Sequence, residues 1–120
     1  MSGETPSSPT ADRIRTLESK VAYLKALNEP GLMIVEGVAT WCGQCKTIAP
    51  VVSDLSARYP EARFYQFDVD QEPDIAQELG IRVMPTFTFF LDGDIQEGVT
   101  GAKPKEIEQA VKKYYTGAAE

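Results

Sequence analysis

The pattern of apolar and polar positions in the first third of the chain predicts a strand, a helix and a second strand. Residues 13–17 alternate weakly, as a short edge strand does. Ser19 is a residue type that caps helices, and we expect a helix from there to about Leu27. Residues 32–38 form a mostly apolar run, which is typical of a strand buried on both faces. The apolar residues at helical spacing between the two strands are Val21, Leu24 and Leu27.

The rest of the chain predicts three more helices and three more strands. Pro60 and Gly80 each mark a helix end, because proline cannot continue a helix and glycine suits the position after one. Asp92 and Gly93 form a hairpin-turn signal, so the strand after them should return antiparallel. The expected elements are a helix from the cysteine pair to about residue 59, a strand at 63–69, a helix at 73–79, strands at 86–91 and 95–99, and a helix from Pro104 with Ile107, Val111 and Tyr114 on one face.

This order of elements predicts an α/β fold. The first half contains a strand–helix–strand crossover, which makes parallel strands, and the end contains a hairpin, so the sheet should be mixed with helices on both faces. With 120 residues the chain has the length of one domain. Residues 1–11 are rich in Ser, Thr, Pro and Gly and are expected to form a flexible tail, which leaves 12–120 as the domain.

Composition and charge narrow the possible partners. Twelve basic and eighteen acidic residues give a net charge of −6, which disfavours nucleic acid as a partner. No apolar stretch approaches the ~20 residues of a membrane span, and the start of the sequence has no apolar signal-peptide core. We therefore expect a cytoplasmic protein without a membrane partner, and a monomer by default.

Cys42 and Cys45 are the only cysteines, and the chain has no histidine. A C-x-x-C pair can be half of a zinc site, but zinc usually takes four ligands, which one such chain does not supply. A site shared between two chains remains an alternative. A purely structural disulfide is also disfavoured, because so short a loop restrains the unfolded chain little. A redox-active dithiol explains the pair best, since C-x-x-C near a strand–helix–strand pattern is typical of redox proteins.

The position of the pair at the start of a helix predicts different roles for the two thiols. The helix N-terminus offers unpaired N–H groups and a partial positive charge, and both favour a thiolate at Cys42. Cys45 lies one turn further along on the same helix face and is expected to be deeper, so it should stay protonated longer. Cys42 would attack a target disulfide, and Cys45 would then resolve the mixed disulfide.

Glu36 is the candidate that removes the proton from Cys45. It stands inside an otherwise apolar strand, where ionisation is costly, so its pKa should rise toward neutral pH. A carboxyl group with such a pKa is suited to proton transfer. The alternative is that the side chain points to solvent at the end of the strand.

Three ordered segments of the chain resemble the thioredoxin family. Residues 39–46, which read Ala-Thr-Trp-Cys-Gly-Gln-Cys-Lys, resemble the family's active-site segment, usually written W-C-G-P-C-K. Residues 80–87, which read Gly-Ile-Arg-Val-Met-Pro-Thr-Phe, are similar to its second signature, and residues 99–102 are similar to a weaker third. The likeness covers about residues 14–115.

The resemblance implies a thioredoxin fold with a five-stranded mixed sheet and four helices. It implies a protein-disulfide reductase that needs no bound cofactor, acts through the Cys42–Cys45 disulfide and is recycled by a flavoenzyme, thioredoxin reductase. Targets would pair with the backbone before Pro85, whose peptide bond the resemblance implies to be cis, although most X–Pro bonds are trans. The implied target-binding residues are Trp41, Gly43, Gln44, Val83, Met84, Pro85 and Gly101.

The chain departs from the family pattern in two places. Gln44 replaces the usual proline between the cysteines, which leaves the redox potential open. Glu36 replaces the usual buried aspartate, and Gly37 replaces a bulky aromatic. We expect these two changes to be coupled, with Gly37 making room for the longer acid.

Two other functions remain as alternatives to a reductase. One is a thiol oxidase or isomerase on the same fold, against which the Trp-Cys-Gly segment argues. The other is a non-enzymatic interaction module, against which the intact cysteine pair argues.

Overall fold

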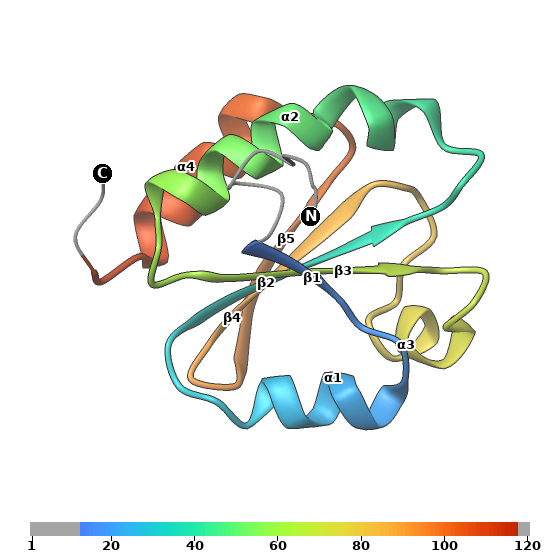
Figure 1. Cartoon of the computed structure of the whole chain (residues 1–120), viewed down its shortest axis with the longest axis horizontal. Coiled ribbons are helices and arrows are strands. Elements are labelled where there is room, and N and C mark those ends of the chain that lie inside the picture. The colour runs from blue at the N-terminus through green and yellow to red at the C-terminus, as the bar shows by residue number, and fades with distance from the viewer. Residues whose placement is uncertain (1–12, 118–120) are drawn as a thin grey trace, which may run out of the picture.

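A computed structural model describes residues 13–117 and contains a five-stranded sheet with helices on both faces (Figure 1). The order of elements is the predicted one, β-α-β-α-β-α-β-β-α. The elements are β1 (Ile14–Thr16), α1 (Lys20–Leu27), β2 (Leu32–Val38), α2 (Gly43–Arg58), β3 (Arg63–Asp68), α3 (Pro73–Glu78), β4 (Thr86–Leu91), β5 (Asp94–Thr100) and α4 (Pro104–Tyr114).

The strand order is β1-β3-β2-β4-β5, with β2 in the middle. β3 is parallel to both β1 and β2, whereas β4 is antiparallel to β2 and β5. The sheet is therefore mixed, as the sequence predicts. All but the last residue of β2 are buried, which agrees with a strand covered on both faces.

The helices divide between the two faces of the sheet, with α2 and α4 on one and α1 and α3 on the other (Figure 1). The α2 and α4 side contains the larger core cluster, which includes Leu55, Phe87 and Ile107. The α1 and α3 side has its own cluster around Phe67 and Ile75. Because β2 contributes alternate side chains to each cluster, both cores meet at the central strand.

The buried face of α1 differs from the one that its apolar spacing suggests. Ser19 caps the helix as predicted, accepting a hydrogen bond from the Ala22 N–H at 3.0 Å. Val21 and Leu24 are exposed, however, and the buried residues of the helix are Tyr23 and Ala26. The ring of Tyr23 packs edge-on against Phe90 of β4, so an aromatic contact sets the rotation of the helix.

The remaining sequence predictions hold within one or two residues at element ends. β1 has only three residues and α3 ends at Glu78. The predicted tail at residues 1–11 lies outside the described residues. None of the helices in the described part of the chain is long and apolar enough to span a membrane.

Candidate active site

The N-terminus of α2 holds the two cysteines as a disulfide. Cys42 is the N-cap residue with an extended backbone, and its sulfur accepts a hydrogen bond from the Cys45 N–H at 3.1 Å. The Cα atoms of the two residues are 5.4 Å apart, and the sulfurs are bonded. The helix start therefore brings the sulfurs together and directs a backbone donor at Cys42.

The predicted difference in depth between the two cysteines is wrong. Cys42 is 6% exposed and Cys45 is 8% exposed, so neither residue is more accessible than the other. The two sulfurs differ instead in position, because Cys42 stands before the first turn of the helix and Cys45 within it. What distinguishes Cys42 is the N–H group that points at its sulfur.

Trp41, directly before Cys42 in the sequence, presents an exposed ring. Its side chain is 65% exposed, and the indole Nε1–H donates a hydrogen bond to the Asp70 carboxylate at 2.8 Å. Asp70 belongs to the turn after β3, where Asp68 in turn accepts a hydrogen bond from the Asp70 N–H. The ring is thus held on the surface by one polar contact, a partnership that the sequence did not predict.

The segment before β4 packs against the region of the disulfide. Met84 packs against the cluster formed by Ala39, Cys42 and Cys45, and the Met84–Pro85 peptide bond is cis, as the resemblance implies. Val83 is 52% exposed, whereas the Pro85 side chain is fully buried. The accessible side chains directly before Pro85 are therefore those of Val83 and, in part, Met84.

Gly101 joins this segment through its backbone. Its N–H donates to the Pro85 carbonyl at 2.7 Å, and its φ angle of +96° is one that favours glycine. Gly43 and Gln44, the two residues between the cysteines, are both exposed in the first turn of α2. Among the predicted target-binding residues the exposure differs: Trp41, Gly43, Gln44 and Val83 are exposed, Met84 and Gly101 are half-buried, and Pro85 is buried.

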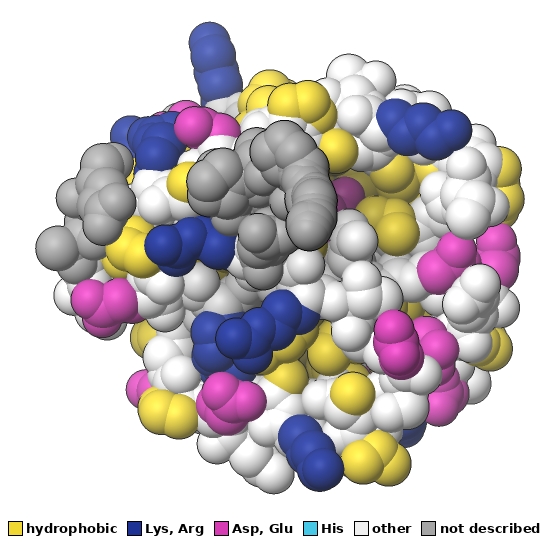
Figure 2. Space-filling view, in the orientation of Figure 1, with side chains coloured by type: hydrophobic (Ala, Val, Ile, Leu, Met, Phe, Trp, Pro, Cys, Tyr) yellow, Lys and Arg dark blue, Asp and Glu magenta, His cyan; other side chains and the backbone are white. Residues whose placement is uncertain are grey.

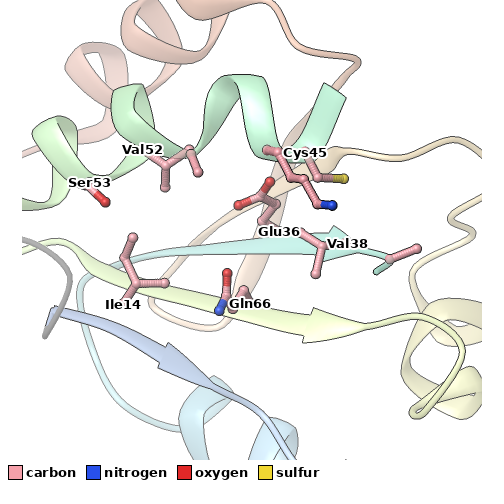
Figure 3. Close-up of a pocket in the computed structure, with 10 residues that line it drawn as sticks. Ile14, Glu36, Val38, Cys45, Val52, Ser53 and Gln66 are labelled. Atoms are coloured by element: carbon pink, nitrogen blue, oxygen red, sulfur yellow. The ribbon is translucent and has the colours of Figure 1, made fainter. Parts of the chain in front are cut away.

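Glu36 is buried and borders a cavity of about 340 Å³ beneath α2 (Figure 3). Its side chain rises from β2 toward α2, and Cys45 borders the same cavity. Only 5% of the residue is exposed, which excludes the alternative that it points to solvent. The acid and the second cysteine therefore face one space.

Burial raises the pKa of Glu36 from its ordinary value to about 8. Within residues 13–117 no hydrogen bond or ion pair holds its carboxyl group. The charged form has lost water without gaining a partner, so the proton is retained near neutral pH. The predicted rise in pKa is thus confirmed, and its cause is desolvation.

The expected coupling between Gly37 and Glu36 is wrong. A Cβ on Gly37 would lie 2.8 Å from Cδ1 of Ile81 and 3.4 Å from Cγ1 of Val69, both on the α1 and α3 side of the sheet. Glu36 faces the opposite side, because successive residues of a strand point to opposite faces. The missing side chain of Gly37 therefore makes room for Ile81, and it does not provide the space that Glu36 occupies.

The cavity also brings together residues that sequence reasoning did not assign to the site. Gln66 of β3 is in register with Glu36 in the neighbouring strand, and its side chain enters the cavity from the sheet (Figure 3). Only strand pairing places the two side by side, and no local pattern indicates it. The other residues that line the cavity are Ile14, Val38, Ala39, Lys46, Ala49, Val52 and Ser53.

A metal centre does not fit this arrangement. The two thiols are joined to each other, and the described residues contain no group of three or more His, Cys, Asp or Glu side chains that could hold a metal ion. The donor set and its geometry instead suit making and breaking one disulfide.

Comparisons with known proteins agree with this chemistry. The family model described as Thioredoxin matches residues 15–113. A thioredoxin of Aspergillus fumigatus, Asp f 29, is 44% identical over 99 residues, which are 81% of this chain and 90% of that protein. Mitochondrial thioredoxin 3 of Saccharomyces cerevisiae, solved in its oxidised form, aligns with a TM-score of 0.83 and 33% identity over 87% of this chain and 98% of that one. A thioredoxin of Nicotiana alata aligns with a TM-score of 0.83 and 35% identity over 97% and 100%. The chain therefore belongs to the thioredoxin family of thiol-disulfide oxidoreductases, and the Cys42–Cys45 disulfide is its redox-active centre.

Proposed function

We propose that Cys42 is the nucleophile that opens a disulfide in a target protein and that Cys45 resolves the product. The Cys42 thiolate bonds to one target sulfur, and the other target sulfur leaves as a thiolate. Cys45 then bonds to the Cys42 sulfur and releases the first target sulfur. Two electrons pass to the target, which is reduced to a dithiol, and the chain is left with the Cys42–Cys45 disulfide.

The observation that carries this assignment is the hydrogen bond from the Cys45 N–H to the Cys42 sulfur at the helix N-cap. A donor directed at sulfur and the positive end of the helix both stabilise a thiolate. Cys45, inside the first turn, lacks that N-cap position. The low exposure of Cys42 requires the target to approach closely along the surface around Trp41 and Val83.

Glu36 in its ionised form, which a pKa of about 8 makes the minor form at pH 7, would accept the Cys45 proton before the second attack. Its carboxyl group shares a cavity with Cys45, and its pKa of about 8 lies close to the ordinary value of a thiol. Proton transfer between groups of similar pKa is efficient near neutral pH. After the second attack, the proton leaves Glu36 to solvent or to the departing target thiolate.

The surface for the target would consist of the exposed residues around the disulfide. Trp41 and Val83 supply apolar area, and Met84, Gly43, Gln44 and Gly101 border it. An extended target segment would pair with the backbone before Pro85, which is a form of strand addition. Such main-chain recognition is tolerant of sequence and suits a reductase with many targets.

Regeneration would need an outside electron source, for which we propose a flavoenzyme of the thioredoxin reductase class. The cytoplasm is the compartment that we propose, because a reductase works where the surrounding thiols are kept reduced. A monomer would leave the surface around the disulfide free for targets. Fractionation of cells and light scattering of the purified chain test these two points.

Trapping and alkylation test the two thiol roles. Cys45→Ser should accumulate mixed disulfides with target proteins, whereas Cys42→Ser, the matched control, should accumulate none. In the reduced wild type, iodoacetamide should modify Cys42 much faster than Cys45 near neutral pH. Trapping by Cys42→Ser alone, or equal alkylation of the two residues, would contradict the assignment.

A further inference from the structure

Lys103 lies at the edge of the surface that holds the disulfide. A series of contacts through Met84, Pro85 and Gly101 connects it to the cysteines. Met84 packs against the cluster that contains the cysteines, and the neighbouring Pro85 carbonyl accepts the Gly101 N–H at 2.7 Å. A Cβ added to Gly101 would meet only Lys103, with Cε at 3.7 Å and Cγ at 4.0 Å. The aliphatic stem of Lys103 therefore crosses the open face of Gly101.

The backbone of Lys103 is held on both sides. Its N–H donates to the Gly101 carbonyl at 3.0 Å, and its own carbonyl accepts the Ile107 N–H at 3.0 Å in the first turn of α4. Pro104 follows at the first position of that helix and restricts the chain further. The ammonium group thus extends from a backbone that two hydrogen bonds and the following proline restrain.

The positive charge of Lys103 is nearly uncompensated. The only carboxylate within ion-pair distance among the described residues is that of Glu106, at 4.0 Å, and the two side chains are 55% and 59% exposed. Pairs this long and this exposed contribute little, because water screens them and both side chains lose freedom. The ammonium is free to bind an anionic group on a partner.

The part of the surface around Trp41 is negative. Trp41 is hydrogen-bonded to Asp70, and the segment around it is acidic at positions 68, 70, 72 and 74. Acidic side chains gather on this side of the molecule, over α3 and the turn before it (Figure 2). Exposed charges that are more than about 8 Å apart are largely screened at physiological ionic strength. The nearest charge on this protein therefore decides how each part of the surface interacts with a charged target, despite the net charge of −6.

We propose that Lys103 is a specificity-determining residue that selects target disulfides with an acidic residue next to the attacked cysteine. This inference rests on the proposed function, because it places the target across Trp41, the disulfide and Gly101. An Asp or Glu side chain on the Gly101 side of the bound segment meets the Lys103 ammonium. A basic residue there meets a like charge, which disfavours that target.

A set of disulfide peptides tests this selection. The peptides share one sequence and carry Glu, Gln or Lys immediately before or immediately after the attacked cysteine. At one of the two positions, wild-type protein should reduce the Glu peptide about three- to tenfold faster in kcat/KM than the Lys peptide, the size expected for exposed charge pairs. Lys103→Glu should reverse the order of the two peptides, and 0.5 M salt should weaken the wild-type preference.

Lys105→Glu is the matched control, since Lys105 is also exposed, lies two residues away and undergoes the same change of charge. It should keep the wild-type order of peptides. Equal rates for Glu and Lys peptides at both positions would overturn the inference, as would equal changes in the two variants. If wild-type protein fails to reduce even the Gln peptides, the proposed function falls and this inference falls with it.

Discussion

Glu36 and Gly37 are adjacent in the central strand, yet their surroundings are opposites. Glu36 faces α2 and borders a cavity of about 340 Å³. Gly37 faces the other side of the sheet, where even a methyl group would come within 2.8 Å of Ile81. At this pair of positions, the face toward α1 and α3 is packed without spare volume, and the face toward α2 leaves open space next to Cys45.

The difference teaches that two adjacent positions of one strand serve stability and chemistry separately, although the larger core cluster lies on the same face as Glu36. Tight packing lowers the free energy of the folded state, because close contacts and buried apolar area accumulate. A buried acid without a partner raises that free energy whenever it ionises. The fold tolerates this cost on the α2 face, where Glu36 lies beside Cys45.

The largest effect that we expect at these two positions is a pH-dependent gain in the stability of the protein for Glu36→Gln. The folded-state pKa of Glu36 is raised to about 8, so its contribution to stability is fully present below the unfolded value of 4.5 and is lost as pH rises through 8. The variant, which does not titrate, should therefore gain on wild type with rising pH. Relative to the difference in unfolding free energy between the two proteins below pH 4.5, the gain should be on the order of 3 kcal/mol at pH 7 and somewhat more at pH 9.

Chemical denaturation of both oxidised proteins at pH 5, 7 and 9 measures this gain. The difference between the two proteins cancels the titration of all other groups. A difference that stays constant over this range would show that Glu36 ionises freely, and the contrast between the two faces would be lost.

The same substitution should slow the second thiol attack more than the first. Without the carboxylate, Cys45 must lose its proton to water, and loss of a general base typically costs about 10²-fold in rate. Stopped-flow fluorescence of Trp41 can separate formation of the mixed disulfide from its resolution. Wild-type rates for both steps in Glu36→Gln would exclude Glu36 as the base.

On the packed face, Gly37→Ala should destabilise the protein by about 1 kcal/mol, because the new methyl group must displace the end of Ile81. The reduction of unfolded-state entropy by alanine offsets part of this cost. Adding Ile81→Val, which removes the clashing methyl group, should recover stability relative to the single variant. If Gly37→Ala is as stable as wild type, this face has more spare volume than the distances indicate.

The smallest effect should be found on the outer surface of α1, which covers the packed face. Leu24 is exposed, so Leu24→Gln should change the free energy of unfolding by less than about 0.5 kcal/mol. Tyr23, one residue earlier, is buried against Phe90, and Tyr23→Ala should cost far more. Similar costs for both variants in urea titrations would indicate that α1 buries the face that its apolar spacing suggests.

Local features of the sequence determine much of this protein. The capping Ser19, the hairpin signal at Asp92 and Gly93, and the order of apolar runs predict every element and the mixed sheet. The C-x-x-C pair at a helix start predicts the redox centre, because both sulfurs then lie on one helix face. The acid inside an apolar strand predicts a raised pKa, since only a solvent-facing side chain would escape burial.

Only the tertiary structure decides which side each feature faces and what it meets there. The rotation of α1 depends on Phe90 in a distant strand, and the space at Gly37 depends on Ile81 from beyond α3. Gln66 joins the cavity through strand register, and Lys103 reaches the disulfide surface through Gly101 and Pro85. These contacts join residues far apart in the sequence, so the packing of whole elements sets them, whereas caps, turns and the helix-end thiols depend on neighbours a few residues away.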